Sequence, residues 1–174
     1  MEFNFIATTF RYREDDLIQE LVELFKEYTA GDLSLYVNKT NIDGLVVGLG
    51  LTNFLDFISF LRKKLKDDPW EIKYLLRFIP IERVVVTDIV KIKEASKDLV
   101  NKIPIDTTFK ISIEKRHTNL KKIDIINEIA PFVPAKVDLN NPSWILLIEI
   151  IGKYTGVSVL RNETLFSSMI EKRV

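Results

Sequence analysis

Residues 107–122 read TTFKISIEKRHTNLKK, and this stretch combines a strand pattern with a cluster of positive charge. Its apolar positions, Phe109, Ile111 and Ile113, alternate with polar positions. Such alternation is typical of a β-strand with one buried face, and here the strand runs into a basic loop. The stretch holds five basic residues and a single acidic one, and its excess of four positive charges is as large as that of residues 77–174 as a whole.

The sequence on both sides of this strand predicts an α+β unit. We expect a helix over residues 88–103, a strand over 107–116, a short helix over 123–133 and strands over 144–151 and 155–160. The segment Trp144–Ile151 is apolar on both of its faces, which is typical of a central strand.

The first half of the chain predicts a second, separate pattern. We expect strands over residues 3–8, 33–38, 45–51 and 70–78, with helices over 13–28 and from Asn53 to about 67. The order is strand, helix, strand, strand, helix, strand, which is the split pattern of ferredoxin-like domains. The predicted fold is therefore α+β, with an N-terminal ferredoxin-like (βαββαβ) domain over 1–78 followed by another domain over 79–174.

Composition excludes several kinds of chemistry. The chain has 174 residues, no cysteine and a single histidine, His117. Disulfides, thiolate nucleophiles and cysteine-based metal sites are therefore absent, and a histidine pair for a metal cannot form. The 25 basic and 25 acidic residues cancel, yet residues 1–76 hold 9 basic and 13 acidic residues whereas 77–174 hold 16 and 12. This asymmetry is of the kind that marks a charged partner.

The chain also lacks the marks of export. Residues 1–10 contain Glu2 and no basic segment before an apolar one, and the most apolar run, Trp144–Ile151, has eight residues including Glu149. Neither a signal peptide nor a membrane helix is expected. Together with the absence of cysteine, this favours a reducing, cytoplasmic location.

Three other features have plain structural interpretations beside functional ones. Gly44, Gly48 and Gly50 lie where a strand meets a helix, but their spacing lacks the fingerprint of a nucleotide-binding loop. Asp15-Asp16 and Asp67-Asp68 lie at helix ends, where acidic residues suit the helix dipole or solvent. One helix also carries an acidic face, which would repel nucleic acid and could face a protein partner; it consists of Glu20, Glu23 and Glu27.

A resemblance to a known family emerges from motifs spread over residues 77–161. They are Arg77-Phe78-Ile79-Pro80, Phe109-Lys110-Ile111 leading into Lys115-Arg116-His117-Thr118, Val137-Asp138-Leu139-Asn140-Asn141-Pro142, Ile148-Glu149-Ile150 and Gly156-Val157-Ser158-Val159. In this order and spacing they resemble the successive signatures of THUMP domains. The split pattern before them is similar to the ferredoxin-like domain that THUMP proteins carry on the N-terminal side.

The resemblance implies a role in tRNA modification. In that family the two domains dock tRNA and hold its single-stranded 3′ acceptor end, while a separate or fused catalytic domain modifies a base. Only residues 161–174 follow the last predicted strand, so we expect no catalytic module, no cofactor and no catalysis by this chain. The most similar type is the stand-alone THUMP protein that serves as accessory factor of tRNA cytidine N4-acetylation. The expected partners are tRNA and a modification enzyme on another chain, an acetyltransferase.

The residues expected to contact RNA are mostly those of the basic strand and loop. Lysine and arginine neutralise phosphates, and Arg116 or His117 could stack on an unpaired base or bond a 2′-hydroxyl. Lys115 and Arg116 are expected at or beyond the strand end, exposed to solvent. Asp138 and Pro142 are interpreted as structural. The candidate RNA-binding residues are Lys110, Lys115, Arg116, His117, Lys121, Lys122, Arg77 and Lys136.

A rival hypothesis comes from a different functional class. Ferredoxin-like domains host many functions, so the chain could instead be a small-molecule-binding or protein-interaction module. A ligand of that kind would bind at the edge formed by Gly44–Gly50 and would depend little on salt, whereas tRNA binding would weaken steeply with salt.

Overall fold

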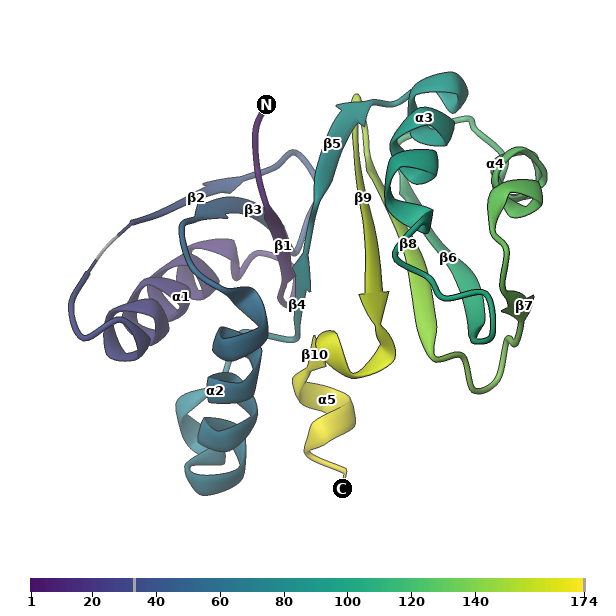
Figure 1. Ribbon diagram of the computed structural model, residues 1–174. Coiled ribbons are helices and arrows are strands. Elements are labelled where there is room, and N and C mark those ends of the chain that lie inside the picture. The colour runs from purple at the N-terminus through teal and green to yellow at the C-terminus, as the bar shows by residue number, and fades with distance from the viewer. Residues whose placement is uncertain (33, 174) are drawn as a thin grey trace. The chain divides into compact units, whose positions relative to one another are not determined.

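The computed structural model of the protein describes residues 1–32 and 34–173 (Figure 1). The chain divides into two compact units. The first unit consists of residues 2–80 together with the chain from Glu163 onward, and the second unit consists of residues 81–162. The C-terminal segment, which the sequence placed with the second domain, therefore belongs to the first unit.

The first unit contains one five-stranded sheet. Its elements are β1 (Phe5–Thr8), α1 (Glu14–Tyr28), β2 (Leu35–Lys39), β3 (Leu45–Gly50), α2 (Phe54–Asp67), the 3₁₀ turn η1 (Pro69–Glu71), β4 (Arg77–Pro80), β10 (Phe166–Ser167) and α5 (Ser168–Glu171). The strand order is β10-β4-β1-β3-β2, and every neighbouring pair is antiparallel. The predicted first three strands and first two helices are confirmed; Leu33, expected in the second strand, lies outside the described residues.

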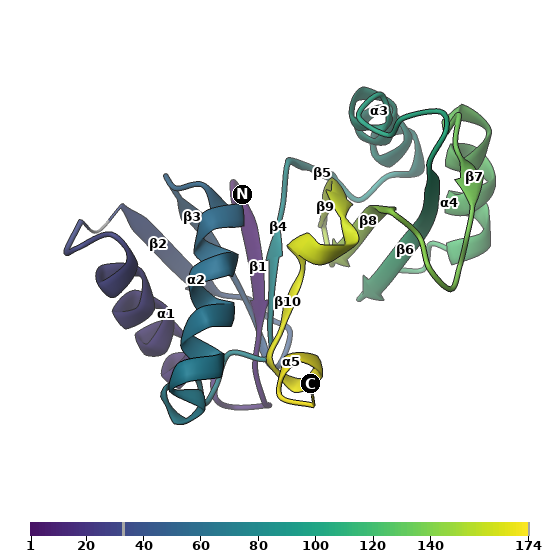
Figure 2. The same ribbon diagram turned by 60° about the horizontal axis from the view of Figure 1, so that its bottom comes forward.

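Aromatic side chains fill the core between this sheet and its two long helices. Phe5 and Phe78 project from β1 and β4 with ring centroids 4.8 Å apart, and Phe25 of α1 meets Phe57 of α2 at 4.2 Å. Figure 2 shows both helices on one side of the sheet. Offset and tilted ring pairs of this kind add stability beyond the area they bury.

The strand predicted over residues 70–78 is wrong for most of its length, because η1 and β4 occupy only its two ends. The carboxylate of Glu20 in α1 accepts hydrogen bonds from the backbone N–H groups of Lys73, Tyr74 and Leu75, at 2.7 to 3.2 Å. Backbone donors that bond a side chain cannot also join a strand ladder. Glu20, expected on a solvated acidic face, is instead a buried structural residue.

The C-terminal segment completes the first unit. Its strand β10 pairs with β4, and its Phe166 is only 1% exposed within the aromatic core. The guanidinium of Arg62 in α2 donates to the Glu171 carboxylate at 2.7 Å and to the Leu165 carbonyl at 2.9 Å. The segment is therefore held by a strand pairing, a buried ring and a partly buried ion pair.

The second unit contains a mixed sheet. Its elements are β5 (Arg83–Val86), α3 (Ile89–Val100), β6 (Thr108–Arg116), α4 (Lys122–Ile129), η2 (Ala130–Phe132), β7 (Lys136–Val137), β8 (Trp144–Ile151) and β9 (Tyr154–Arg161), and the 3₁₀ turn η3 (Asn162–Thr164) follows. The strand order is β5-β9-β8-β6-β7, with β9 antiparallel to both of its neighbours and β6 parallel to β7 and β8. The central position predicted for residues 144–151 is confirmed, whereas β5 was not predicted.

Helices α3 and α4 cover one face of this sheet (Figure 1). Ile92 and Leu99 of α3 and Ile125 and Ile129 of α4 pack on the face that carries Phe109, as the helical and strand periodicities predict. The predicted start of α3 is also confirmed, because the Asp88 carboxylate accepts hydrogen bonds from the N–H groups of Val90 and Lys91 at 2.9 and 3.1 Å.

Replacing Phe166 with alanine should destabilise the first unit, although the residue lies near the C-terminus. Removing a buried phenylalanine ring costs about 3–5 kcal/mol. Each unit has one tryptophan, Trp70 in the first and Trp144 in the second, so urea unfolding followed by fluorescence in a Trp144→Phe background reports on the first unit. The control, Met169→Ala, changes a side chain that is 53% exposed and should shift stability by about 0.5 kcal/mol or less. Equal midpoints for both variants would contradict this role.

Candidate functional site

The topology of the second unit brings its strand ends and helix starts to one edge. Strands β5, β6, β7 and β8 all run in the same direction, and α3 and α4 each return across the sheet before the next parallel strand. Both helices therefore begin at the edge where β5 and β6 end. At this edge Arg116 of β6 pairs with Ile151 of β8, and Tyr154 of β9 pairs with both Ile151 and Val86 of β5.

The loop between β6 and α4 lies at this edge and is held by specific hydrogen bonds. The Arg116 carbonyl accepts from the Gly152 N–H at 2.9 Å, which ties the loop to the β8–β9 turn. His117 has a φ of 55° and is exposed, so it marks the sharp bend that follows β6. The Lys115 ammonium donates to the Leu120 carbonyl at 2.8 Å and keeps further donors exposed.

Positive charge gathers at the start of α4. Lys121 occupies the N-cap position and Lys122 begins the helix, and within the described chain no side chain caps these first N–H groups. A helix N-terminus attracts anions because its free N–H groups and its dipole are positive. Lys153 lies in the turn tied to the same loop and is exposed, although it was not among the candidate residues. We name this surface the basic edge, and it consists of Lys115, His117, Lys121, Lys122 and Lys153.

Arg116 differs from its neighbours. Its guanidinium donates to the carboxylate of Glu149 at 2.7 Å, and the Glu149 side chain is fully buried while that of Arg116 is 21% exposed. Arg116 does end β6, as predicted, but the expectation that it is exposed to solvent is wrong. Arg116 lies on the face of β6 opposite to α3 and α4, where it neutralises a buried negative charge.

Two other candidate residues of the second unit lie away from the basic edge, and one candidate belongs to the first unit. Lys110 is six residues before Arg116 on the same strand, about 20 Å along β6. Lys136 in β7 pairs with Thr108, about 26 Å from the end of β6, at the opposite edge of the sheet. Arg77 belongs to β4 of the first unit and is half-buried. Within the second unit, the structure thus brings together Lys115, His117, Lys121 and Lys122, and does not group Lys110 or Lys136 with them.

The glycines of the first unit have packing roles. A Cβ on Gly48 would lie 2.1 Å from the Phe5 ring, so the aromatic core requires glycine there. Gly44 has a φ of 74°, and its N–H donates to the Glu14 carboxylate at 2.5 Å. This hydrogen bond lowers the pKa of Glu14. These contacts account for both glycines without a bound phosphate.

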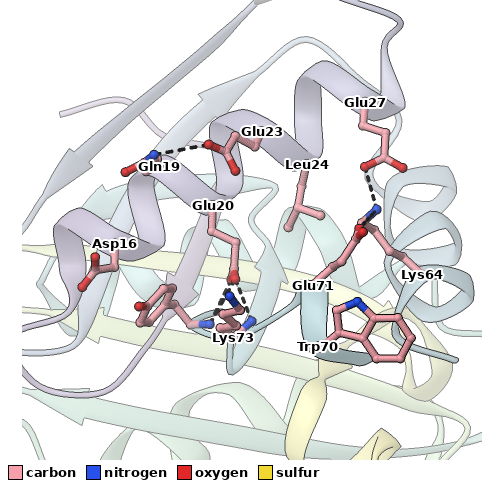
Figure 3. Close-up of a pocket in the computed structure, with 11 residues that line it drawn as sticks. Asp16, Gln19, Glu20, Glu23, Leu24, Glu27, Lys64, Trp70, Glu71 and Lys73 are labelled. Carbon is pink, nitrogen blue, oxygen red and sulfur yellow. Dashed lines mark hydrogen bonds and ion pairs between the residues drawn. The ribbon is translucent and has the colours of Figure 1, made fainter. Parts of the chain in front are cut away.

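The first unit also contains a groove of about 570 Å³ beside α1 and η1, shown in Figure 3. Carboxylates dominate its lining, and the pair Glu27 and Glu71 is bridged by Lys64 of α2, whose side chain is only 10% exposed. Burial lowers the pKa of Lys64, but its hydrogen bonds to the two carboxylates outweigh this and raise the pKa above its usual value. Trp70 is 65% exposed at this groove. The carboxylates that line the groove make it unsuitable for a nucleic-acid backbone, which is also negatively charged.

Among residues 1–32 and 34–173, no group of three or more His, Asp or Glu side chains is placed to hold a metal ion. No helix in this part of the chain is both long and apolar enough to cross a membrane.

The comparison with protein families identifies the second unit. Residues 86–160, from the end of β5 into β9, match the family model of the THUMP domain. The chain therefore contains a THUMP domain, and the resemblance seen in its motifs is confirmed to that extent. The matched residues include the β6–α4 loop and all five residues of the basic edge.

Solved structures share the fold of most of the chain. PH1313 from Pyrococcus horikoshii Ot3 matches 92% of this chain with a TM-score of 0.65 and 11% identity. A 4-thiouridine synthetase solved with RNA and ATP matches 92% with a TM-score of 0.59 and 18% identity, and TrmN from Thermus thermophilus matches 89% with 0.58 and 11%. The chain spans 55%, 42% and 44% of these three chains, respectively. No curated protein matches by sequence.

Replacing Arg116 with alanine should destabilise the second unit far more than replacing its neighbour Lys115. Loss of one partner from a buried ion pair leaves an uncompensated charge and costs about 3–5 kcal/mol. Lys115 is exposed, so Lys115→Ala should change stability by about 0.5 kcal/mol. Urea unfolding in a Trp70→Phe background, with Trp144 as the reporter, measures both. Similar stabilities of the two variants would show that the ion pair is dispensable.

Proposed function

We propose that this protein binds tRNA at its acceptor end and presents it to a separate modification enzyme, a tRNA cytidine acetyltransferase. The observation that carries the proposal is the basic edge inside the matched THUMP domain. One of the structures with the same fold is a 4-thiouridine synthetase solved with RNA, which supports an RNA ligand.

The basic edge supplies the contacts that an RNA end requires. Lys115, Lys121, Lys122 and Lys153 offer ammonium groups to successive phosphates, and the start of α4 adds backbone N–H donors. His117, at the bend of the loop, offers a ring that stacks on an unpaired base or bonds a 2′-hydroxyl. Arg116 acts indirectly in this proposal, by holding the end of β6 through Glu149.

The first unit contributes orientation rather than affinity. We infer a ferredoxin-like arrangement for it, supported by its order of elements from β1 to β4 and by the antiparallel strand order β4-β1-β3-β2. Residues 1–76 have four more acidic than basic residues, and its groove is lined by carboxylates. Such a unit repels phosphates and therefore limits RNA contact to other surfaces.

Binding of tRNA should weaken steeply with salt, and the variant Lys121→Ala/Lys122→Ala should reduce both affinity and salt dependence. Each lost phosphate contact to a single strand lowers the slope of log affinity against log salt by about 0.7, so the double variant should lose about 1.4. The matched control, Lys63→Ala/Lys66→Ala, removes the same charge from exposed positions of α2 and should leave the slope unchanged. Titrations at several salt concentrations measure the slopes. Salt-independent binding of a small ligand instead, with no tRNA binding, would favour the rival small-molecule or protein-interaction module.

The chain alone should not modify tRNA. The sequence has no cysteine and a single histidine, so it lacks a thiolate nucleophile and a pair of imidazole bases, and we assign the chemistry to another chain in the cytoplasm. Purified protein incubated with tRNA and either acetyl-CoA with ATP or S-adenosylmethionine should give no product by nucleoside mass spectrometry. Adding a tRNA cytidine acetyltransferase should yield N4-acetylcytidine, in larger amount with this protein than without it. Product formed by this chain alone would contradict the proposal.

A further inference from the structure

A second positively charged surface lies between α3 and α4, away from the basic edge. Lys93 and Lys97 are one turn apart on α3, and both ammonium groups lie over the ring of Phe132 in η2, at 5.2 and 4.0 Å from its centroid. Glu128 of α4 bonds Lys93 at 2.8 Å. We name this surface the α3–α4 seam, and it consists of Lys93, Lys97, Glu128 and Phe132.

The charges of the seam are not balanced. The two ammonium groups approach the same ring, so they lie within about a Debye length of each other and repel. Glu128 neutralises Lys93, whereas Lys97 forms no ion pair with any carboxylate in the described chain. Lys97 is exposed and contacts the ring instead of a carboxylate, so its ammonium group is available to an anion from solution.

The exposed ring of Phe132 is the second feature of the seam. Phe132 is 38% exposed, while its neighbour Val133 is the residue that enters the core. An exposed ring next to lysines is the arrangement with which proteins bind single-stranded nucleic acid, since bases stack on aromatic rings and phosphates pair with the cations. The seam thus offers both contacts that an unpaired nucleotide needs.

We propose that the α3–α4 seam is a second RNA contact, in which a phosphate draws the flexible Lys97 side chain off the Phe132 ring and an unpaired base stacks on the ring in its place. The inference rests on the proposed tRNA binding and extends it along the helices. The basic edge lies at the start of α4 and Phe132 follows its end, and the eight residues of α4 span about 12 Å. A single strand anchored at the basic edge would follow α4 to the seam.

The test uses the full chain and a tRNA acceptor-stem hairpin with a single-stranded 3′ end in which 2-aminopurine replaces one unpaired base at a time. Phe132→Leu keeps an apolar side chain but removes the stacking surface, so affinity should fall roughly 5- to 150-fold, as loss of one stacked base implies. In the same variant, the fluorescence quenching of the 2-aminopurine that stacks on Phe132 should also be lost. Phe132→Trp should restore both, which a role in packing alone does not explain.

The charge is tested separately. Lys97→Gln should lower the salt slope by about 0.7, whereas Lys63→Gln, an equal charge change at an exposed position of α2, should not. Wild-type affinity and quenching in both Phe132→Leu and Lys97→Gln, with binding still weakened by Lys121→Ala/Lys122→Ala, would overturn the seam and leave the proposed function intact. Failure of the wild-type chain to bind the hairpin at all would overturn both.

Discussion

The parallel pairing of β6 with β8 is the constraint on which the second unit depends. Their register runs from Phe109 opposite Trp144 to Arg116 opposite Ile151 without a break. Parallel neighbours cannot be joined by a tight hairpin and need a crossover that returns across the sheet. Because α3 and α4 serve as the returns before β6 and β7, both helices start at the same edge. The basic edge is a consequence of that topology, since it combines a strand end, a helix start and the turn at Gly152.

The two kinds of cation at the end of β6 have different tasks. Arginine carries a planar set of donors that suits a carboxylate and keeps its charge when partly buried, and Arg116 uses it on the buried Glu149. Lysine is a compact, hydrated charge on a flexible stem, which suits exposed phosphate contacts, and the basic edge consists mainly of lysines. Charge counts along the sequence do not separate the two, because the separation depends on which face of β6 each side chain occupies.

Strong periodicity made much of the fold predictable. The alternation in residues 107–116 and the apolar run 144–151 each correspond to a strand of the second sheet, and the helices with a capping aspartate or asparagine begin where expected. The missed elements depend on distant partners. Strand β5 has four residues and exists by pairing with β9, and β10 has two and exists by pairing with β4. The segment after η1 has strand-like residues, but Glu20 of α1 occupies its backbone donors.

The candidate site was predictable to a similar extent and for similar reasons. The basic residues from Lys115 to Lys122 are neighbours in the sequence, so composition alone predicted that they form a charged site. Lys153 joins it through the register of β6, β8 and β9 and the hydrogen bond between Gly152 and Arg116, and Lys93, Lys97 and Phe132 meet because α3 packs beside α4. The distribution of charge, like these contacts, depends on how the chain folds into two units. The total charge is zero, but residues 1–76 of the first unit hold 13 acidic and 9 basic residues, whereas the second unit, residues 81–162, holds 13 basic and 10 acidic ones. Neighbouring charges within each unit reinforce one another over a Debye length. A charged partner responds to those local fields and not to the zero total, so a protein without net charge can carry a basic surface.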